Sequence, residues 1–210
     1  MQKLHLYLVR HGESQGNSTG DYSTLASGAL SALGQAQAQH LVQPLSALHF
    51  DLIIVSPLQR ALQTIAPYLM QTDQRAEVWP ELAEVPLRED RVGIAESWTS
   101  QPAELPEELP GRYDFREGQA IQPGPNEPLG QGLYRVEVVK RRLLALVEER
   151  PMTILMVSHG HFLRELMNSL FANPEIIFYR HENCGMSSII GQDTWAVDYL
   201  NLPTGPRSQP

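Results

Sequence analysis

This chain of 210 residues carries a formal charge of −8 at pH 7 and contains one cysteine, Cys184. Its length suits a single domain, residues 1–210, with a sizeable core. The negative charge argues against nucleic acid and anionic membrane surfaces as main partners, and no apolar run is long enough to span a membrane. One cysteine excludes an internal disulfide and fits a reducing compartment. We therefore expect a cytoplasmic protein that is a monomer or a homodimer.

The first predicted element is a buried strand over residues 4–9, an apolar run that Gly12 ends. Arg10 and His11 follow directly, so both should lie at the carboxyl end of this strand. In open α/β sheets ligands bind at that end. An imidazole beside a guanidinium at this place is typical of a nucleophile held next to an anion.

Strand-like and helix-like segments alternate along the rest of the chain. Further strands are predicted at 51–55, 77–79, 153–157, 187–190 and 195–200, the last two as a hairpin at a sheet edge. Helices are predicted after the N-cap Ser31, from Pro57 at a first helical position, over 131–149 and over 161–170. Pro44 either kinks the first of these helices or starts another. The alternation predicts a three-layer α/β/α sandwich with a mainly parallel central sheet.

Residues 85–130 differ from the rest of the chain. They hold seven prolines, nine acids and four arginines, and they have few periodic apolar residues. A connection of this length without regular structure is commonly a functional lid. We therefore expect an extended, proline-rich lid insertion within the single domain.

Charged residues follow three of the predicted strands. Arg10 and His11 follow the first, Arg60 comes shortly after the second, and His159 follows the strand over 153–157. The carboxyl ends of parallel strands share one edge of the sheet, so these four side chains should converge. Arginine donates two parallel hydrogen bonds to one oxyanion. The set predicts a pocket for a phosphate or a carboxylate.

At this point the chain resembles the histidine phosphatase superfamily, which has the phosphoglycerate mutase-like fold. Four segments carry the resemblance in the right order, and a fifth precedes the last strands. They are residues 10–17, 30–36, 56–64, 157–160 and 183–185. Each motif alone is weak evidence, whereas four in order, spread over nearly the whole chain, are strong evidence.

The resemblance implies a role for each matching residue. His11 is the nucleophile and carries a phosphohistidine, and His159 acts beside it. Residues that hold the phosphate are Arg10, Asn17, Arg60, His159 and Gly160. Preorganised donors around the three equatorial oxygens suit phosphoryl transfer. No metal or other cofactor is expected, because the arginines supply the positive charge.

The leaving alkoxide needs a proton, and the resemblance places this acid at Glu84. Glu81 is the second candidate and Glu96 the third. A general acid works best when its surroundings raise its pKa. Residues 85–88 replace the glycine-containing stretch that commonly follows the acid in relatives, so the choice stays open.

Several of these residues also have a plainer interpretation. Asn17 fits a loop cap, and Glu13 fits an acid in the first turn of a helix. His159 and His161 form no evident metal site, because acidic partners at suitable spacing are missing. The backbone amide of His161 faces the phosphate, or its side chain touches the substrate. Histidines without a motif are read as structural: His5, His40, His49 and His181.

The predicted function is a metal-independent phosphatase acting on a small phosphomonoester, with a phosphoprotein substrate also possible. Phosphoglycerate mutase-type transfer is the alternative. Mutase relatives carry an arginine- and lysine-rich stretch after the acid, whereas residues 85–130 have more acids than arginines. The third alternative is a protein that binds a phosphorylated ligand without catalysis. Such a protein is expected to have lost the nucleophile or a phosphate-binding residue, and here all of them are present.

Overall fold

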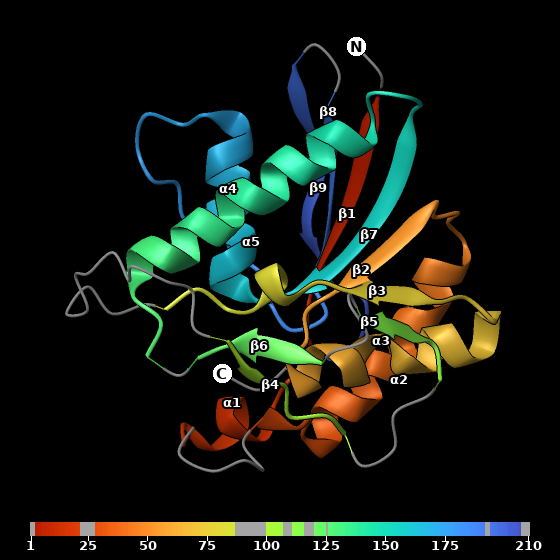
Figure 1. The fold of residues 1–210 in the computed structure, drawn as a ribbon. Helices are drawn as coiled ribbons and strands as arrows, with labels where there is room; N and C mark the ends of the chain where they lie inside the picture. The colour runs from red at the N-terminus through yellow and green to blue at the C-terminus, as the bar shows by residue number, and fades with distance from the viewer. Residues whose placement is uncertain are drawn as a thin grey trace.

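The computed structural model describes residues 3–21, 28–86, 100–106, 111–115, 120–124, 126–191 and 194–206. A central seven-stranded sheet has the order β5-β3-β2-β7-β1-β8-β9 (Figure 1). Its strands are β1 (Leu4–Arg10), β2 (Leu52–Val55), β3 (Ala76–Val78), β5 (Tyr113–Phe115), β7 (Met152–Ser158), β8 (Met186–Gly191) and β9 (Trp195–Leu202). The first five are parallel to one another, whereas β8 runs antiparallel to β1 and forms an antiparallel hairpin with β9 at one edge. The predicted mainly parallel sheet is confirmed.

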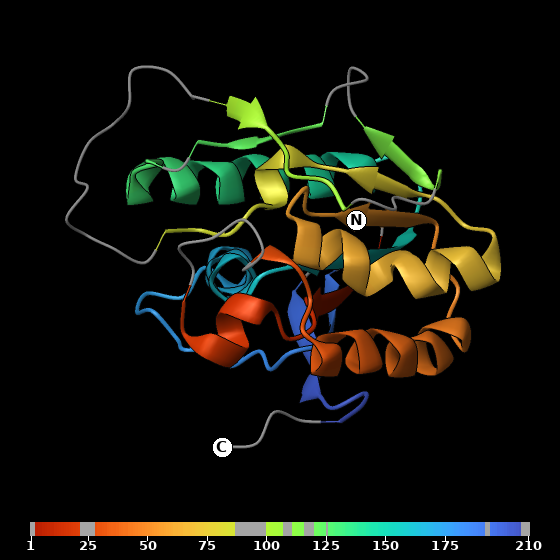
Figure 2. The same cartoon turned by 90° about the horizontal axis from the view of Figure 1, so that it is seen from below.

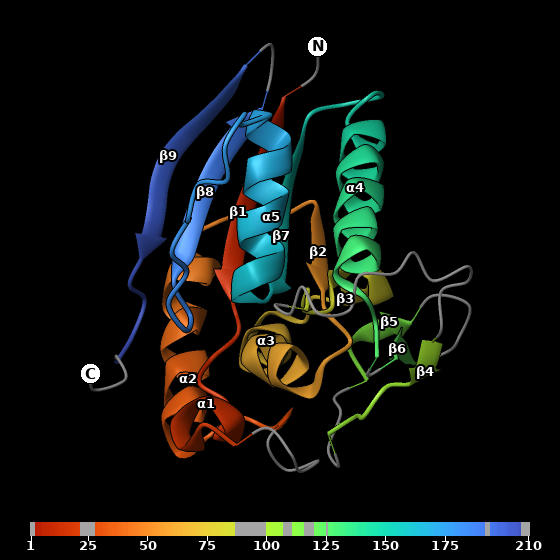
Figure 3. The same cartoon turned by 90° about the vertical axis from the view of Figure 1, so that its left-hand side faces the viewer.

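Helices cover both faces of this sheet (Figures 2 and 3). They are α1 (Gln15–Thr19), α2 (Ala32–Ser46), α3 (Gln59–Thr72), α4 (Leu129–Leu146), α5 (Gly160–Phe171) and the short 3₁₀ helix η2 (Pro80–Leu82). Alternate residues of β1 point into separate apolar clusters. Leu6 and Leu8 pack with α4 and α5, whereas Tyr7 and Val9 pack with α2 and α3. The three-layer sandwich is therefore confirmed. Within the described ranges, no helix is both long and apolar enough to cross a membrane.

Local side chains set the starts of α2 and α3. Ser31 caps α2 as predicted, because its Oγ accepts a hydrogen bond from Gly34 N at 3.1 Å. The helix continues through Pro44 to Ser46 as one element. The prediction for α3 was wrong by two residues: Pro57 lies before the helix, and the N-cap is Leu58. The Ser56 hydroxyl accepts a hydrogen bond from Leu58 N at 3.3 Å, which holds this turn outside the helix.

Helix α4 also differs from its prediction. It begins at Leu129 and ends at Leu146, so the predicted end near residue 149 was wrong. Val136, Val139 and Leu143 are buried as the periodicity indicates, but Leu133 is 39% exposed. Arg135 is buried instead, with 3% of its surface exposed. The buried face of α4 thus includes the charged side chain of Arg135 and leaves out Leu133.

The segment 85–130 contains more regular structure than expected. Two short strands, β4 (Ser100–Pro102) and β6 (Ile121–Pro123), form a separate antiparallel pair, and β5 extends the central sheet beyond β3. Strands of three residues have too little periodicity to be read from a sequence. The prolines at the ends of β4 and β6 are tolerated because each strand has one partner only. The lid role stays a prediction, and Glu96 lies outside the described residues.

Candidate active site

The carboxyl ends of β1, β2 and β7 meet at one edge of the sheet. Arg10 pairs with Ser158 in the parallel register, and His11 N donates to the Ser158 carbonyl at 2.9 Å. On the other side of β7, Ser56 N donates to the Val157 carbonyl at 3.0 Å. The predicted convergence is confirmed. It places the rings of His11 and His159 with their centroids 5.0 Å apart.

Hydrogen bonds fix the tautomer of His11, which is 3% exposed. Its Nδ1 lies 2.7 Å from the Gly12 carbonyl, and a carbonyl only accepts, so Nδ1 carries the hydrogen. The lone pair is therefore on Nε2, where Arg60 Nε donates to it at 3.1 Å. Burial, then the charges of Arg60 and Arg10, hold the pKa of His11 well below its ordinary value. His11 is a neutral imidazole that faces a guanidinium.

The loop after His11 is held against α2 and α3 by very close packing. Gly12 N donates to Thr64 Oγ1 at 2.8 Å. A methyl group at Gly34 would lie 2.0 Å from the Glu13 carbonyl oxygen, so only glycine fits there. This contact explains why position 34 is a glycine.

The sequence predicted Glu13 in the first turn of a helix, and this prediction was wrong. Glu13 precedes Ser14, the N-cap of α1. Its carboxylate accepts a hydrogen bond from Ser31 Oγ at 2.7 Å, and its backbone N donates to Gln37 Oε1 at 2.8 Å. Glu13 therefore fastens the loop after His11 to α2.

Asn17 forms a capping box with Ser14. Its Oδ1 accepts from Ser14 N, and Ser14 Oγ accepts from Asn17 N, both at 3.1 Å. The plainer interpretation of Asn17 as a cap is thus correct. Asn183 lies next to it and donates to the His11 carbonyl at 2.9 Å. Contact between Asn17 and a phosphate stays a prediction.

Arg10 and the start of α5 lie side by side. Arg10 Nη1 donates to the His181 carbonyl at 2.8 Å. Gly160 is the first residue of α5, and a methyl group there would lie 3.6 Å from Arg10 Nε. The N-terminus of a helix presents backbone N–H groups and a partial positive charge. Arg10 and α5 thus offer donors to an anion from adjacent positions.

His159 is completely buried at the N-cap of α5. Its Nε2 is hydrogen-bonded to Ser56 Oγ at 2.7 Å, whereas its Nδ1 has no hydrogen-bond partner among the described residues. Burial, followed by the charge of Arg60, lowers the pKa of His159 well below its ordinary value. Sequence reasoning missed Ser56, although its place directly after β2 was a usable signal.

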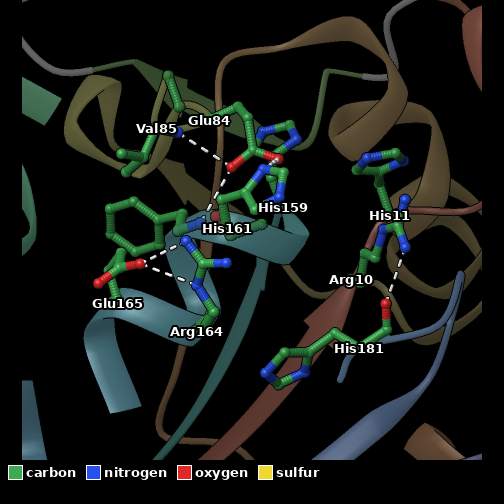
Figure 4. Close-up of polar contacts among 12 residues, drawn as sticks. Arg10, His11, Glu84, Val85, His159, His161, Arg164, Glu165 and His181 are labelled. Atoms are coloured by element: carbon green, nitrogen blue, oxygen red, sulfur yellow. Dashed lines mark hydrogen bonds and ion pairs between the residues drawn. The ribbon is translucent and has the colours of Figure 1, made fainter. Parts of the chain in front are cut away.

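Glu84 reaches across to the start of α5 (Figure 4). Its Oε1 accepts hydrogen bonds from Val85 N and Phe162 N, each at 3.0 Å, and its Oε2 lies 3.6 Å from His161 Nδ1. Burial raises the pKa of Glu84. The hydrogen bond and charge of His161, together with Phe162 N and Arg60, outweigh burial and place this pKa below its ordinary value. Glu84 therefore rests as a carboxylate beside His161. Glu81 lies in η2, and its carbonyl accepts from an arginine of α4.

A cavity of about 630 Å³ adjoins these groups. It is formed by the carboxyl edge of the sheet on one side and by the chain after α5 on the other. Its walls include Arg10, Glu84, Gly160, His161, Arg164, Phe178, Tyr179, Arg180 and His181. Residues near the end of the chain, from Asn201 to Pro206, also line it, so this volume extends well beyond Glu84.

The other histidines have contacts of several kinds. His5 Nε2 is hydrogen-bonded to Ser188 Oγ at 2.7 Å, and His40 Nδ1 donates to the Ala36 carbonyl at 2.8 Å. His181 is buried, and its ring nitrogens have no hydrogen-bond partner in the described part of the chain. Among the residues that the structure describes, no three His, Cys, Asp or Glu side chains are grouped to hold a metal ion.

Comparison with curated proteins finds relatives of two kinds. A probable phosphoglycerate mutase, GpmB of Proteus mirabilis, is 31% identical over 209 residues, which cover 95% of this chain and 87% of that protein. The adenosylcobalamin/α-ribazole phosphatase of Escherichia coli K12 is 40% identical over 82 residues. That match covers 39% of this chain and 40% of the relative. The chain thus spans about two fifths of the phosphatase in this match.

Solved structures share the fold over almost the entire chain. A proposed α-ribazole-5′-P phosphatase from E. coli K-12 has a TM-score of 0.70 and 26% identity, with 97% of this chain and 99% of that one covered. A phosphoserine phosphatase from Entamoeba histolytica, in complex with 3-phosphoglyceric acid, has a TM-score of 0.65 and 21% identity, with 94% and 96% covered. The latter identity supports the fold alone.

The family model described as histidine phosphatase superfamily (branch 1) matches residues 6–202. This span includes all the strand ends that converge at the site, and relatives within the family are phosphatases and phosphoglycerate mutases. The chain therefore belongs to branch 1 of the histidine phosphatase superfamily.

Proposed function

We propose that this protein is a metal-independent phosphatase that hydrolyses a small phosphomonoester through a phosphohistidine at His11. The observation that carries the proposal is the state of His11. Its Nδ1 is anchored to the Gly12 carbonyl, and its Nε2 lone pair faces the Arg60 guanidinium in a buried pocket. A neutral imidazole with one oriented lone pair is a ready nucleophile.

Substrate binding begins with an exchange at Arg60. A phosphoryl oxygen takes over the N–H that Arg60 Nε donates to His11 in the free protein, and this frees Nε2. Arg10 and the backbone N–H groups at the start of α5 contact the other oxygens. His159 completes the set: with Ser56 Oγ donating to its Nε2, its Nδ1 carries a hydrogen that it donates to the phosphate.

The chemistry then proceeds in two steps. His11 Nε2 forms a bond to phosphorus while the ester P–O bond breaks, and the leaving oxygen takes a proton from the Glu84 carboxyl. Water next attacks phosphorus, the P–N bond breaks, and the Glu84 carboxylate takes the proton of the water. Inorganic phosphate and neutral His11 result. Donors already in place around the transferring group stabilise both transition states.

Glu84 has to gain a proton before the first step, because its pKa in the free protein is below the ordinary value. A bound phosphate dianion adds negative charge beside Glu84 and engages the charge of Arg60. Both changes raise the pKa of Glu84, so substrate binding and proton uptake are coupled. His161, which lies 3.6 Å from Glu84, is the nearest titratable partner.

Phosphatase chemistry is favoured over mutase chemistry by the charge of the insertion. Of its four arginines, Arg112 lies within the described residues and is paired with Asp73, directly after α3 and away from the catalytic edge. A mutase needs further cations to hold a second anionic group. The cavity beside Glu84 supports a small organic leaving group.

Phosphate release by EDTA-treated protein from a panel of phosphomonoesters tests this function. The panel includes 3-phosphoglycerate, 2,3-bisphosphoglycerate and a phosphoserine peptide. We expect release from one or more small esters by wild-type protein and none by the His11→Ala variant. Conversion of 3-phosphoglycerate to its 2-isomer without net release would instead identify a mutase. Absence of turnover on the whole panel would point to a binding protein.

A further inference from the structure

Four consecutive carbonyls in the segment that carries Glu84 are bound by side chains from outside it. Arg135 Nη1 donates to the carbonyls of Glu81 and Ala83 at 2.7 and 2.8 Å, and Arg135 Nη2 donates to that of Glu84 at 3.0 Å. The intervening Leu82 carbonyl accepts from Ser158 Oγ at 2.8 Å. Residues 81–84, at the end of η2 and just after it, are thereby held by side chains of α4 and β7.

All five N–H groups of Arg135 are used in this arrangement. The two that do not reach the segment donate to Glu127: Nε to Oε1 at 2.6 Å and Nη2 to Oε2 at 2.5 Å. Both side chains are almost completely buried, with 3% and 5% exposed. Burying a charged pair is unfavourable unless its hydrogen-bonding groups are satisfied, and the planar fork of arginine allows this. Arg135 therefore donates three hydrogen bonds to backbone carbonyls and two to the Glu127 carboxylate.

Gly132 allows α4 to come close enough for these bonds. A methyl group at Gly132 would lie 2.9 Å from Pro86 Cδ and 3.1 Å from Val85 Cγ1. One turn of α4, with Gly132 and Arg135, is therefore shaped around the residues that flank Glu84. Glu127, just before α4, belongs to the predicted lid segment and ties its end to the same place.

We propose that Arg135, anchored by Glu127, is a positioning residue that holds Glu84 at the distance needed for proton transfer. This inference rests on the proposed function, in which Glu84 is the acid. The Glu84 carboxylate reaches Phe162 N on α5 only while the backbone of its own segment stays against α4 and β7. A displacement of about 1 Å is enough to lower a proton-transfer rate about 100-fold.

The test compares two substrates with leaving groups of similar size. Benzyl phosphate needs a proton on its leaving oxygen, whereas p-nitrophenyl phosphate does not. The double variant Arg135→Met/Glu127→Leu removes both charges together, so neither is left buried alone. We expect kcat/KM to fall about 100-fold for benzyl phosphate and less than about fivefold for p-nitrophenyl phosphate. Arg135→Lys, which keeps the charge but not the fork, should fall between wild type and the double variant.

Arg142→Met is the matched control. Arg142 lies two turns further along α4, with its guanidinium 3.3 Å from the centroid of the Trp79 ring. Its replacement disturbs the packing of α4 near η2 without touching the carbonyls that Arg135 binds. The ratio of the two rates should equal that of the wild type.

Two results would overturn the inference. An equal loss on both substrates in the double variant would mean that the pair only supports the fold, and the absence of a loss on either substrate would mean that Glu84 is held by other contacts. If the double variant does not fold, the ratio in Arg135→Lys decides by the same criteria. A wild-type protein inactive on both esters would contradict the proposed function itself, which is distinct from an active wild type with an unaltered ratio in the variants.

Discussion

At the scale of single residues, the surroundings of His11 and of Glu84 give these two side chains different charge states. Burial and two guanidiniums keep His11 neutral, whereas His161, Phe162 N and Arg60 keep Glu84 ionised in spite of burial. A neutral His11 has a lone pair available for attack, whereas the ionised Glu84 has to gain a proton before it can act as an acid. In the proposed mechanism, the charge of a bound phosphate raises the pKa of Glu84 and favours this protonation.

Replacement of Glu84 by glutamine should affect substrates according to their leaving groups. Glu84→Gln keeps the shape and the acceptor that faces Val85 N and Phe162 N but has no proton to transfer. We expect kcat for benzyl phosphate to fall about 10²- to 10⁴-fold and that for p-nitrophenyl phosphate only a few-fold. Steady-state kinetics on both esters measures this. Equal losses would place the acid elsewhere, with Glu81 as the next candidate.

Removal of His161 should shift the pH profile upward. His161→Leu deletes the hydrogen bond and the charge that lower the pKa of Glu84, so this pKa should rise. The protonated acid then persists to higher pH. We expect the basic limb of kcat for benzyl phosphate to move to higher pH, with little change for p-nitrophenyl phosphate. A loss of benzyl phosphate activity at every pH, with p-nitrophenyl phosphate unaffected, would show that His161, rather than Glu84, delivers the proton.

At the scale of elements, the loop after His11 depends on the close approach of α2. A side chain at Gly34 would collide with the backbone of Glu13, which is two residues after His11. No rotamer change relieves a contact with a backbone oxygen. Helix α2 and the loop therefore have to move apart if Gly34 is replaced.

Gly34→Ala should destabilise the fold by about 2–3 kcal/mol, the cost of an overpacked contact. Gly130→Ala is the control, because a methyl group there meets nothing within 4 Å. A glycine replaced by alanine inside a helix gains up to about 1 kcal/mol. Urea unfolding of the two variants checks this pair of expectations. Equal stabilities would contradict the close packing of α2 on the Glu13 backbone.

Elements could be predicted where the apolar pattern was strong. The crowded apolar runs of β1, β2 and β7 placed Arg10 and His159 at strand ends, and the register brought them together as expected. The short strands within 85–130 carry no such pattern. The role of Arg135 could not be predicted either. Its burial depends on Glu127 and on carbonyls 51 to 54 positions away in the sequence, and the periodicity of apolar residues does not report such contacts.

At the scale of the whole molecule, several buried histidines make the fold sensitive to acid. The pKa values of His11 and His159 are held well below the ordinary value, and that of His181 is lowered to about 4, in each case mainly by burial. In the unfolded chain the pKa of a histidine is about 6.5. Below that pH the unfolded state binds protons that the folded state does not, so stability falls as pH falls.

His181→Phe should make this loss of stability less steep. The pKa of His181 is about 4 in the folded protein and about 6.5 in the unfolded chain. Between these two pH values the side chain takes up a proton only on unfolding, and the variant removes this group. The free energy of unfolding should then fall by about 1.4 kcal/mol less per pH unit within the lower part of this window. Urea unfolding at pH 7.5, 6 and 5 measures the slope. A slope equal to the wild type would mean that His181 is protonated in the folded protein.

The central claim is that His11 carries the phosphoryl group during turnover, and trapping the intermediate tests it most directly. Wild-type protein and His11→Ala are mixed with a labelled phosphomonoester, quenched rapidly at high pH and digested for mass spectrometry. We predict one phosphoryl group on His11, labile to acid and absent from the variant. A phosphoryl group on another residue, or turnover by His11→Ala, would contradict the account.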